Sequence, residues 1–390
     1  MPVHNRKKVI FFLPTLSIGG GERVVSDLSL SFPDSIETVI VLLKNKVSYS
    51  CKGKIISLDI PISNPLFLRI YYFFVCLFRF KKIIKKEKPD YVISFGPPLN
   101  IVNLFSNKKN ILRVDNVMSS SGKGLIYKLL IKLFYNKAPK IICVSQVSAE
   151  DLINNFGIKK EKIAVIYNPL NVKEIQSLIS EPLELEYEEI FKKPTIITAG
   201  RLTKQKNQRC IITAFPGVKN EIKEAQLVIL GSGELEPELK LLAKDLKIAN
   251  SVHFLGWQKN PFKFLAKARA FILSSLWEGL PCVVLEAMAC RLPVILADCK
   301  SGPREIIAPN SKLDSETSGI EYADYGILIP PFNKKSKSQE ILTEAIIKIL
   351  TDKDLSAALS AKSLQRAKDF DAKKIIKKWE FLEHESNKIS

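Results

Sequence analysis

Short apolar runs alternate with longer amphipathic segments along the whole chain. The runs are rich in β-branched residues and are bounded by turn-forming residues, a pattern that is typical of buried strands. The segments between them repeat apolar residues every three or four positions, as helices do when they cover one face of a sheet. The alternation therefore predicts βαβ units and parallel sheets covered by helices on both faces.

The alternation occurs twice. In the first half, the predicted strands are 8–13, 38–43, 91–95, 110–114 and 140–144, and the predicted helices are 21–31, 66–86, 124–135 and 147–156. In the second half, the predicted strands are 194–199, 226–230, 251–255, 270–273 and 293–296, and the predicted helices are 208–218, 236–248, 262–268, 281–289 and 338–351. We expect a first domain at 1–168, a linker at 169–193, a second domain at 194–370 and a final helix within 371–390. Two doubly wound domains in series leave a cleft, and ligands of such sheets bind beyond the carboxyl ends of the strands.

Composition narrows the possible classes of protein. The chain has 390 residues, of which 46% are apolar, so two globular cores are feasible. No uncharged apolar stretch reaches 18 residues, so we expect no membrane-spanning helix, and the run 9–13 is too short for a signal-peptide core. Seven scattered cysteines without a CxxC pair predict neither a disulfide framework nor a zinc site. With three separated histidines, the sequence predicts no metal ion and no bound cofactor.

The charge is distributed unevenly. The net charge is +19, and residues 1–180 carry 27 Lys and Arg against 12 Asp and Glu. Segment 66–88 combines two Tyr and five Phe with seven cations and one acid, and 124–140 joins apolar residues with lysines. Such a surface suits either an anionic membrane leaflet or a nucleic acid, and a core helix with a basic tail is the structural alternative.

Three segments contain candidate chemistry. Gly19, Gly20 and Gly21 stand between a predicted strand and a helix, where a backbone can approach a phosphate closely. Arg201 and Lys206 follow the first strand of the second domain, and both side chains can neutralise phosphate oxygens. Each segment could also be an ordinary turn or a pair of solvated cations.

The third segment runs from Trp277 to Glu286. Glu278 is expected in the loop just before a helix and Glu286 inside that helix, among apolar neighbours. A carboxylate in such surroundings needs a hydrogen-bonding partner, and sugar hydroxyls could provide the donors. An internal salt bridge is the alternative for Glu286.

Together these segments resemble the retaining glycosyltransferases of family 4. The resemblance rests on 13–23 (LPTLSIGGGER), on Gly200-Arg201-Leu202 with Lys206-Asn207, and on Glu278 and Glu286 in an E-x7-E arrangement. Segments 301–306 (SGPREI) and 325–330 (YGILIP) add to it. The resemblance implies the GT-B α/β fold, in which two Rossmann-like domains face a cleft and the final helix returns to the first domain.

The resemblance also implies roles for individual residues. Arg201 and Lys206 would neutralise the leaving diphosphate, and Gly20 and Gly21 would approach the donor from the other domain. Glu278, Gly279 and Leu280 would contact the donor sugar, and Glu286 the ribose. Many members carry a His after the fifth strand of the first domain; this chain has Asp115 there, which we consider a contact to the acceptor or to a sugar.

The sequence therefore predicts a retaining, metal-independent hexosyltransferase. A nucleotide sugar, with UDP favoured, would be the donor, and a lipid-linked or lipopolysaccharide-type glycan would be the acceptor. We expect a cytoplasmic protein attached peripherally to the inner face of the cytoplasmic membrane, with no nucleic-acid partner. A sugar-nucleotide epimerase of the same fold and a basic nucleic-acid-binding protein are the alternatives. The oligomeric state is left open.

Overall fold

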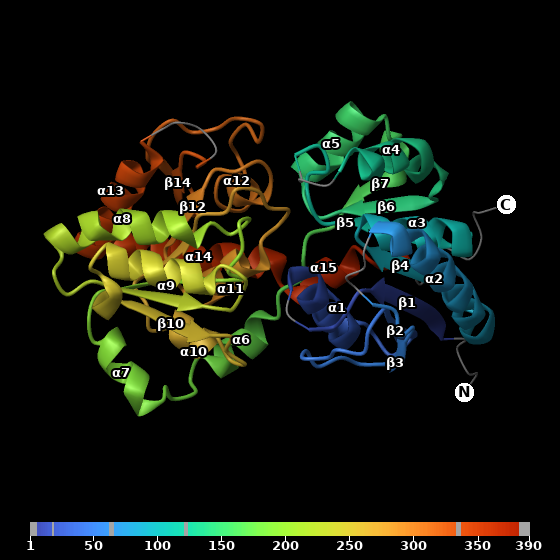
Figure 1. The fold of residues 1–390 in the computed structure, drawn as a ribbon, viewed down its shortest axis with the longest axis horizontal. Coiled ribbons are helices and arrows are strands. Elements are labelled where there is room, and N and C mark those ends of the chain that lie inside the picture. The colour runs from blue at the N-terminus through green and yellow to red at the C-terminus, as the bar shows by residue number, and fades with distance from the viewer. Residues whose placement is uncertain (1–5, 18, 62–65, 121–123, 333–336, 382–390) are drawn as a thin grey trace. The chain divides into compact units, whose positions relative to one another are not determined.

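The computed structural model describes residues 6–17, 19–61, 66–120, 124–332 and 337–381. The chain divides into two compact units (Figure 1). Unit 1 comprises Met1–Pro169 together with Ala372–Ser390, and unit 2 comprises Leu170–Asp371. Each unit contains its own sheet and its own hydrophobic core, and each is described separately.

Unit 1 is built on a seven-stranded sheet in which every neighbouring pair of strands is parallel. In sheet order, the strands are β3 (Lys54–Ser57), β2 (Ile36–Leu42), β1 (Lys7–Leu13), β4 (Tyr91–Phe95), β5 (Asn110–Val114), β6 (Lys140–Cys143) and β7 (Ile163–Val165). The helices are α1 (Gly20–Ser31), α2 (Leu66–Glu87), α3 (Pro97–Ser106), α4 (Leu125–Phe134), α5 (Gln146–Phe156) and α15 (Ala372–Lys377). β4 is buried along its whole length and β1 from Val9 onward, because helices cover both faces of the sheet, which explains why these segments are mostly apolar.

Unit 2 repeats this design. In sheet order, its strands are β10 (Val252–Gly256), β9 (Gln226–Leu230), β8 (Thr195–Ala199), β11 (Ala270–Leu273), β12 (Val294–Ala297), β14 (Gly326–Ile329) and β13 (Glu321–Ala323). Only the edge strand β13 is antiparallel to its neighbour among these strands. The helices are α6 (Val172–Leu178), α7 (Leu185–Phe191), α8 (Gln208–Glu221), α9 (Glu236–Asp245), α10 (Phe262–Leu265), α11 (Cys282–Ala289), α12 (Gly302–Ile307), α13 (Ser338–Thr351) and α14 (Lys353–Ala367).

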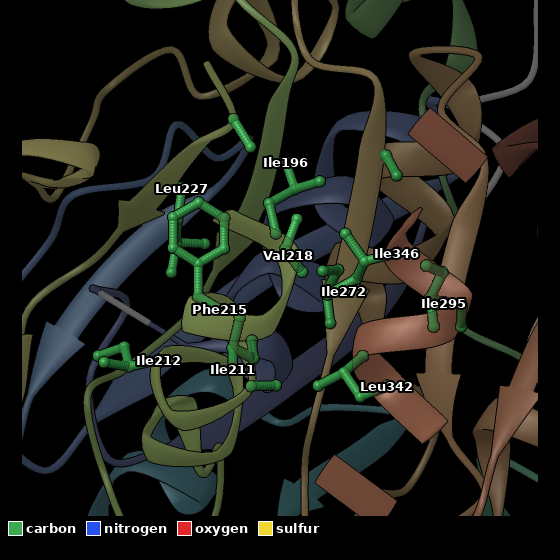
Figure 2. Packing of buried hydrophobic residues seen from close by; sticks show 14 of the residues in the cluster. Ile196, Ile211, Ile212, Phe215, Val218, Leu227, Ile272, Ile295, Leu342 and Ile346 are labelled. Carbon is green, nitrogen blue, oxygen red and sulfur yellow. The ribbon is translucent and has the colours of Figure 1, made fainter. Parts of the chain in front are cut away.

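The core of unit 2 lies between the sheet and the helix pair α8 and α13. Figure 2 shows Phe215 and Val218 of α8 and Ile346 of α13 packed with side chains of the central strands, all of them fully buried. The two helices approach closely at Gly217, where a Cβ would lie 2.7 Å from Cγ2 of Thr343. Removing a buried aromatic such as Phe215 typically costs about 3–5 kcal/mol, so this contact fixes α8 on the sheet.

The predicted α/β fold with two doubly wound parallel sheets is confirmed. Segment 169–193 differs from the expectation, because instead of a linker it contains α6 and α7, which belong to unit 2. The aromatic ring of Tyr187 on α7 packs against Phe264, with the ring centres 5.5 Å apart. The high Glu and Pro content of this segment therefore marks a solvated helical surface and not a free connection.

The end of the chain packs in unit 1. Helix α15 contacts α1, and the ring of the fully buried Trp379 meets Phe32 edge-on, with 6.2 Å between ring centres. The helix is shorter than the segment 371–390 within which it was expected, and residues 382–390 lie outside the described part of the chain. Among the described residues, no helix has both the length and the apolar content that crossing a bilayer requires.

Candidate active site

The carboxyl end of the unit 2 sheet brings two of the predicted residues into contact. Lys206 lies in the loop after β8 and Glu278 in the loop after β11, and 2.6 Å separates Nζ of Lys206 from Oε1 of Glu278. The hydroxyl of Ser275 donates to the same carboxylate oxygen, also at 2.6 Å. The Lys206 and Glu278 side chains are only 15% and 7% exposed. The fold therefore holds a charged pair in fixed geometry at the edge where ligands of such sheets bind.

Backbone contacts between the two loops position this pair. The Leu276 amide donates to the Gln205 carbonyl at 2.8 Å, and the Gln205 side-chain amide donates to the Trp277 carbonyl at 2.9 Å. The hydroxyl of Ser274 donates to the carbonyls of Lys206 and Asn207, at 3.0 and 2.9 Å. Because both loops are tied along their backbones, the pair does not depend on its own attraction for its position.

The start of α8 adds a partial positive charge beside Lys206. Asn207 caps the helix with a φ of 52°, so α8 begins two residues after Lys206 and directs its N-terminal end toward the loop. Arg201, in the same loop, is exposed to solvent. The sequence suggested two similar loop cations, whereas the structure shows one exposed cation and one that is paired and mostly buried. Together with the helix terminus, they suit an anionic ligand such as a diphosphate.

The loop after β12 forms hydrogen bonds to the turn that contains Glu278. The Ser301 hydroxyl and the Gly302 amide both donate to the carbonyl of Gly279, at 2.8 and 2.7 Å. A Cβ at Gly302 would lie 2.2 Å from that oxygen, so only glycine allows this approach. Ser301 has a φ of 101°, which is a strained backbone conformation for a residue with a side chain. The adjacent Leu280 is buried, so the turn from Glu278 to Leu280 is packed against surrounding residues.

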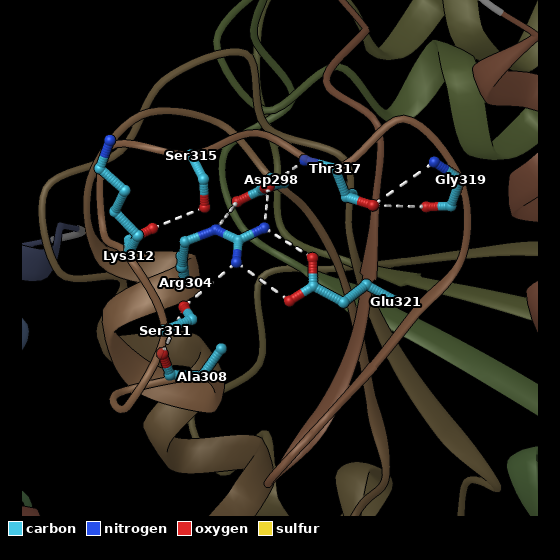
Figure 3. Close-up of polar contacts among 9 residues, drawn as sticks. All are labelled: Asp298, Arg304, Ala308, Ser311, Lys312, Ser315, Thr317, Gly319 and Glu321. Carbon is cyan, nitrogen blue, oxygen red and sulfur yellow. Dashed lines mark hydrogen bonds and ion pairs between the residues drawn. The ribbon is translucent and has the colours of Figure 1, made fainter.

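The loop that carries Ser301 is itself anchored by a buried arginine (Figure 3). The guanidinium of Arg304 donates to both carboxylate oxygens of Asp298 and, at 3.0 and 2.8 Å, to both oxygens of Glu321. It also reaches the Ser311 hydroxyl at 3.1 Å, and the Thr317 amide donates to Asp298 at 2.7 Å. This network joins the end of β12 to β13 and holds the loop that contacts Gly279.

Glu286 lies on α11, eight residues after Glu278, and its side chain is half-buried. Burial raises the pKa of the nearby Cys290 thiol, and repulsion from the Glu286 carboxylate adds to that rise. A similar effect operates at the buried Cys299, whose pKa is raised by burial and by the charge of Glu278. Both thiols are therefore protonated at neutral pH and are not nucleophiles.

The remaining predicted residues belong to unit 1. Gly20 and Gly21 form the first turn of α1. A Cβ at Gly21 would make only an ordinary contact with Phe95, at 3.7 Å, so packing within unit 1 does not require a glycine there. Room for a ligand's close approach is an alternative reason for it.

Asp115 follows β5, and its carboxylate Oδ1 accepts a hydrogen bond from Nε of Arg113 at 2.7 Å. The Asp115 side chain is 29% exposed, whereas that of Arg113 is completely buried. Sequence reasoning did not identify Arg113, although a charged residue inside the otherwise uncharged strand NILRV was a usable signal. It also assigned no role to Ser275 or Ser301, which follow strands at the same sheet edge as Lys206.

Over the described ranges, no three His, Cys, Asp or Glu side chains are grouped so that they could hold a metal ion. The charged groups that meet at the unit 2 site are instead Lys206 and Glu278.

Comparisons with known proteins identify the family to which the chain belongs. Residues 18–174 match the model of Glycosyltransferase Family 4, and residues 185–366 match that of Glycosyl transferases group 1. An uncharacterised glycosyltransferase of Methanocaldococcus jannaschii is 38% identical over 358 residues, covering 85% of this chain and 88% of that protein.

A second relative has a named activity. It is the Campylobacter jejuni N-acetylgalactosamine-N,N'-diacetylbacillosaminyl-diphospho-undecaprenol 4-alpha-N-acetylgalactosaminyltransferase, 31% identical over 95% of this chain and 98% of that protein. Among solved structures, Anabaena HepE in complex with UDP and glucose superposes with a TM-score of 0.77 at 18% identity, covering 97% of this chain and all of HepE. At that identity the likeness shows the GT-B fold alone.

Proposed function

The chain belongs to the glycosyltransferases of family 4, and on this premise we propose that it transfers a sugar from a nucleotide-sugar donor to a lipid-linked or lipopolysaccharide-type glycan. The observation that carries the proposal is the Lys206–Glu278–Ser275 cluster at the carboxyl edge of the unit 2 sheet. A cation, a carboxylate and a helix N-terminus meet there, as binding a diphosphate and a sugar together requires.

Each group has a task in the proposed reaction. The bond between the anomeric carbon and the diphosphate breaks, and the acceptor oxygen bonds to that carbon with retained configuration. The proton of the acceptor hydroxyl is released, and negative charge develops on the departing nucleotide diphosphate. Lys206 and the exposed Arg201 would stabilise that charge, so we propose that the enzyme needs no metal ion. Glu278 would accept hydrogen bonds from sugar hydroxyls, and Gly279 and Leu280 would line the same subsite.

The proposed identities of the substrates are supported by the names of relatives and not by a single residue. The Campylobacter relative is named for an acceptor linked to undecaprenol through a diphosphate, and HepE was crystallised with UDP. We propose a UDP-linked hexose or N-acetylhexosamine as the donor and a lipid-linked glycan as the acceptor. Release of UDP from candidate donors should then depend on added lipid-linked acceptor; release of no nucleotide with any donor and acceptor pair would reject the proposal.

The two glutamates should have separable effects. Glu278→Gln should slow transfer while UDP affinity stays near that of the parent, because Glu278 is assigned to the sugar. Glu286→Gln should weaken UDP itself, about tenfold, because a hydrogen bond between a carboxylate and the ribose would be lost. Calorimetric titration of UDP into both variants measures the difference. Glu238→Gln, an exposed change on α9, is the control, and parent-like UDP affinity in Glu286→Gln would refute the ribose assignment.

Unit 1 presents a surface suited to the membrane that carries such an acceptor. On α2, Ile70, Tyr71, Phe74 and Phe78 are each 60–70% exposed, and they share one helix face. On α4, Leu125, Ile126, Leu129 and Leu133 are 55–85% exposed in the same spacing. Both helices pack against α3, and exposed lysines accompany both stripes. We propose that this aromatic and basic surface docks peripherally in the headgroup region of an anionic leaflet. The side chain of Arg69, part of the expected surface, lies outside the described residues.

Membrane docking has a direct test. The parent should sediment with anionic liposomes and be released by high salt, because salt screens the attraction between lysines and lipid headgroups. Changing the exposed Lys81, Lys82, Lys85 and Lys86 together to Ser should abolish most of the binding and leave UDP affinity unchanged. The control carries Ser at four exposed lysines of unit 2, namely Lys223, Lys244, Lys267 and Lys353. Equal sedimentation of the two variants would place the docking surface elsewhere.

A further inference from the structure

A small cavity in unit 1 lies at the carboxyl ends of β4 and β5. Its volume is about 50 Å³, and it is lined by Gly96, Pro97, Asn100, Arg113, Val114, Asp115, Asn116, Met118 and Tyr135. All of these residues belong to unit 1, so the cavity is complete within that unit. It lies at the edge of the sheet where ligands of doubly wound folds bind.

Arg113 has unused hydrogen-bonding capacity at this cavity. Its Nε donates to Asp115 and its Nη2 donates to Asn168, while its guanidinium lies over the Phe95 ring at 5.4 Å. The remaining nitrogen, Nη1, is buried and has no hydrogen-bond partner among the described residues. A buried, charged donor without a partner costs free energy, so its retention points to a ligand atom that accepts from it.

Two further groups complete the polar side of the cavity. The Tyr135 hydroxyl accepts from Nδ2 of Asn100 at 3.0 Å, and the same Nδ2 donates to the Arg113 carbonyl at 3.0 Å. Ser94 donates to Oδ1 of Asn100 at 2.7 Å, which fixes the orientation of that amide. With Asn100 as its donor, Tyr135 retains its own O–H for an acceptor. Oδ2 of Asp115, whose Oδ1 binds Arg113, is available to accept a hydrogen bond.

The groups that line the cavity determine which charge and shape a ligand must have to fit it. The charge of Arg113 is already matched by Asp115, and an added anion would lie beside that carboxylate, which disfavours a phosphate or a carboxylate. The site offers two donors, one acceptor and the apolar walls of Val114, Met118 and Pro97. An acetamido group presents the complement: a carbonyl oxygen for the donors, an N–H for the carboxylate and a methyl for the walls. A lone hydroxyl would leave the apolar walls without contact.

We propose that this cavity binds the acetamido group of an N-acetylated sugar substrate, with Arg113 and Asp115 as specificity-determining residues. The inference rests on the proposed sugar transfer and deepens it by naming a class of substrate. Either the donor sugar or the terminal sugar of the acceptor can carry the group. The chemistry of the cavity is the same in both cases, and the experiment distinguishes them.

The test compares matched substrates on the full chain. Transfer efficiency is measured with UDP-N-acetylglucosamine and UDP-N-acetylgalactosamine against UDP-glucose and UDP-galactose, and with lipid-linked acceptors ending in an N-acetylhexosamine or in a hexose. Val114→Ile adds one methylene at the cavity wall, and Val92→Ile adds the same group at a buried position of β4 away from it. Val114→Ile should lower the transfer efficiency with the acetamido substrate of one pair roughly ten- to hundredfold. The efficiency with the corresponding hydroxyl substrate should stay nearly unchanged. Val92→Ile should leave every preference unchanged.

The possible results show whether the donor or the acceptor carries the acetamido group, and they distinguish failure of this inference from failure of the proposed function. Loss of preference confined to the donor pairs assigns the cavity to the donor, and loss confined to the acceptor pair assigns it to the acceptor. Arg113→Lys, which keeps the charge but lacks Nη1, should reduce the same preference. Equal efficiency with acetamido and hydroxyl substrates in the parent, or an equal loss for both in Val114→Ile, would show that the cavity holds water only and overturn this inference. If no nucleotide sugar binds or reacts, the proposed function fails as well, which is a different result from transfer without preference.

Discussion

Replacing Lys206 by Ala should lower the rate of sugar transfer by about a hundredfold or more, because negative charge on the departing diphosphate would lose its fixed partner. Lys204→Ala is the matched control, since Lys204 lies exposed in the same loop two residues away and should leave the rate almost unchanged. Added Mg²⁺ should not restore the Lys206→Ala rate if side chains alone supply the positive charge. Steady-state rates at saturating donor measure both effects.

The structure also changes what the Lys206 substitution should do to stability. A solvated loop cation, one of the alternatives from the sequence, would contribute little to stability, but Lys206 is paired with a nearly buried carboxylate. Removing it leaves Glu278 with Ser275 as a donor, and a loss of about 1–3 kcal/mol is expected. Activity should therefore be compared well below the melting temperature of the variant. A folded Lys206→Ala protein that transfers sugar at the parent rate would exclude Lys206 from the diphosphate site.

Replacing Arg304 by Met should destabilise unit 2 by about 3–5 kcal/mol, because a buried ion pair that loses one partner leaves the other charge uncompensated. Asp298 is 2% exposed and would lose a bidentate partner, while Glu321 would lose two hydrogen bonds. Met keeps much of the side-chain length, so the loss reports on charge more than on packing. Denaturant unfolding followed by the fluorescence of Trp257 and Trp277, both in unit 2, measures it.

The control for this prediction is Arg209→Met on α8. Arg209 is paired with Glu238, but both side chains are more than half exposed, so its loss should change stability by less than about 1 kcal/mol. If Arg304→Met unfolds at the same denaturant concentration as the parent, the network does not anchor the loop of Ser301. A stable Arg304→Met protein with parent-like transfer would also remove the argument that this loop supports the Glu278 turn.

The strongly apolar elements could be predicted from the sequence. The predicted strands 91–95, 110–114, 226–230 and 270–273 coincide with β4, β5, β9 and β11, because strands buried on both faces leave mostly apolar runs. Edge strands have no such pattern: β3 is partly exposed and β7 has three half-buried residues. Helix α3 was missed because it opens with Pro97 and Pro98, which punctuate a sequence even where they begin a helix.

Only the part of the site that lies at the carboxyl ends of the strands could be predicted from the sequence. Lys206 and Glu278 follow strands, and carboxyl ends of parallel strands share an edge, so their proximity was foreseeable. The pairing of Arg113 with Asn168 was not, because 55 residues separate them and no local pattern relates them. Likewise, the role of Ser301 depends on the close approach of Gly302 to Gly279, which is a property of the packed loops.

The division of the chain also dictates an order of assembly on the ribosome. Unit 2 is continuous in sequence, whereas unit 1 needs Trp379 to cover Phe32 and thus remains incomplete until nearly the whole chain has been synthesised. The chain passes from one unit to the other after Pro169 and again after Asp371. The two connections lie side by side at their unit 2 ends, where the Leu170 amide donates to the Phe370 carbonyl at 2.9 Å. The second unit can therefore close while the first, although translated earlier, still exposes an aromatic surface. A nascent chain released before residue 379 would present that surface to chaperones and proteases, so N-terminal residues would be the last to gain protection from degradation.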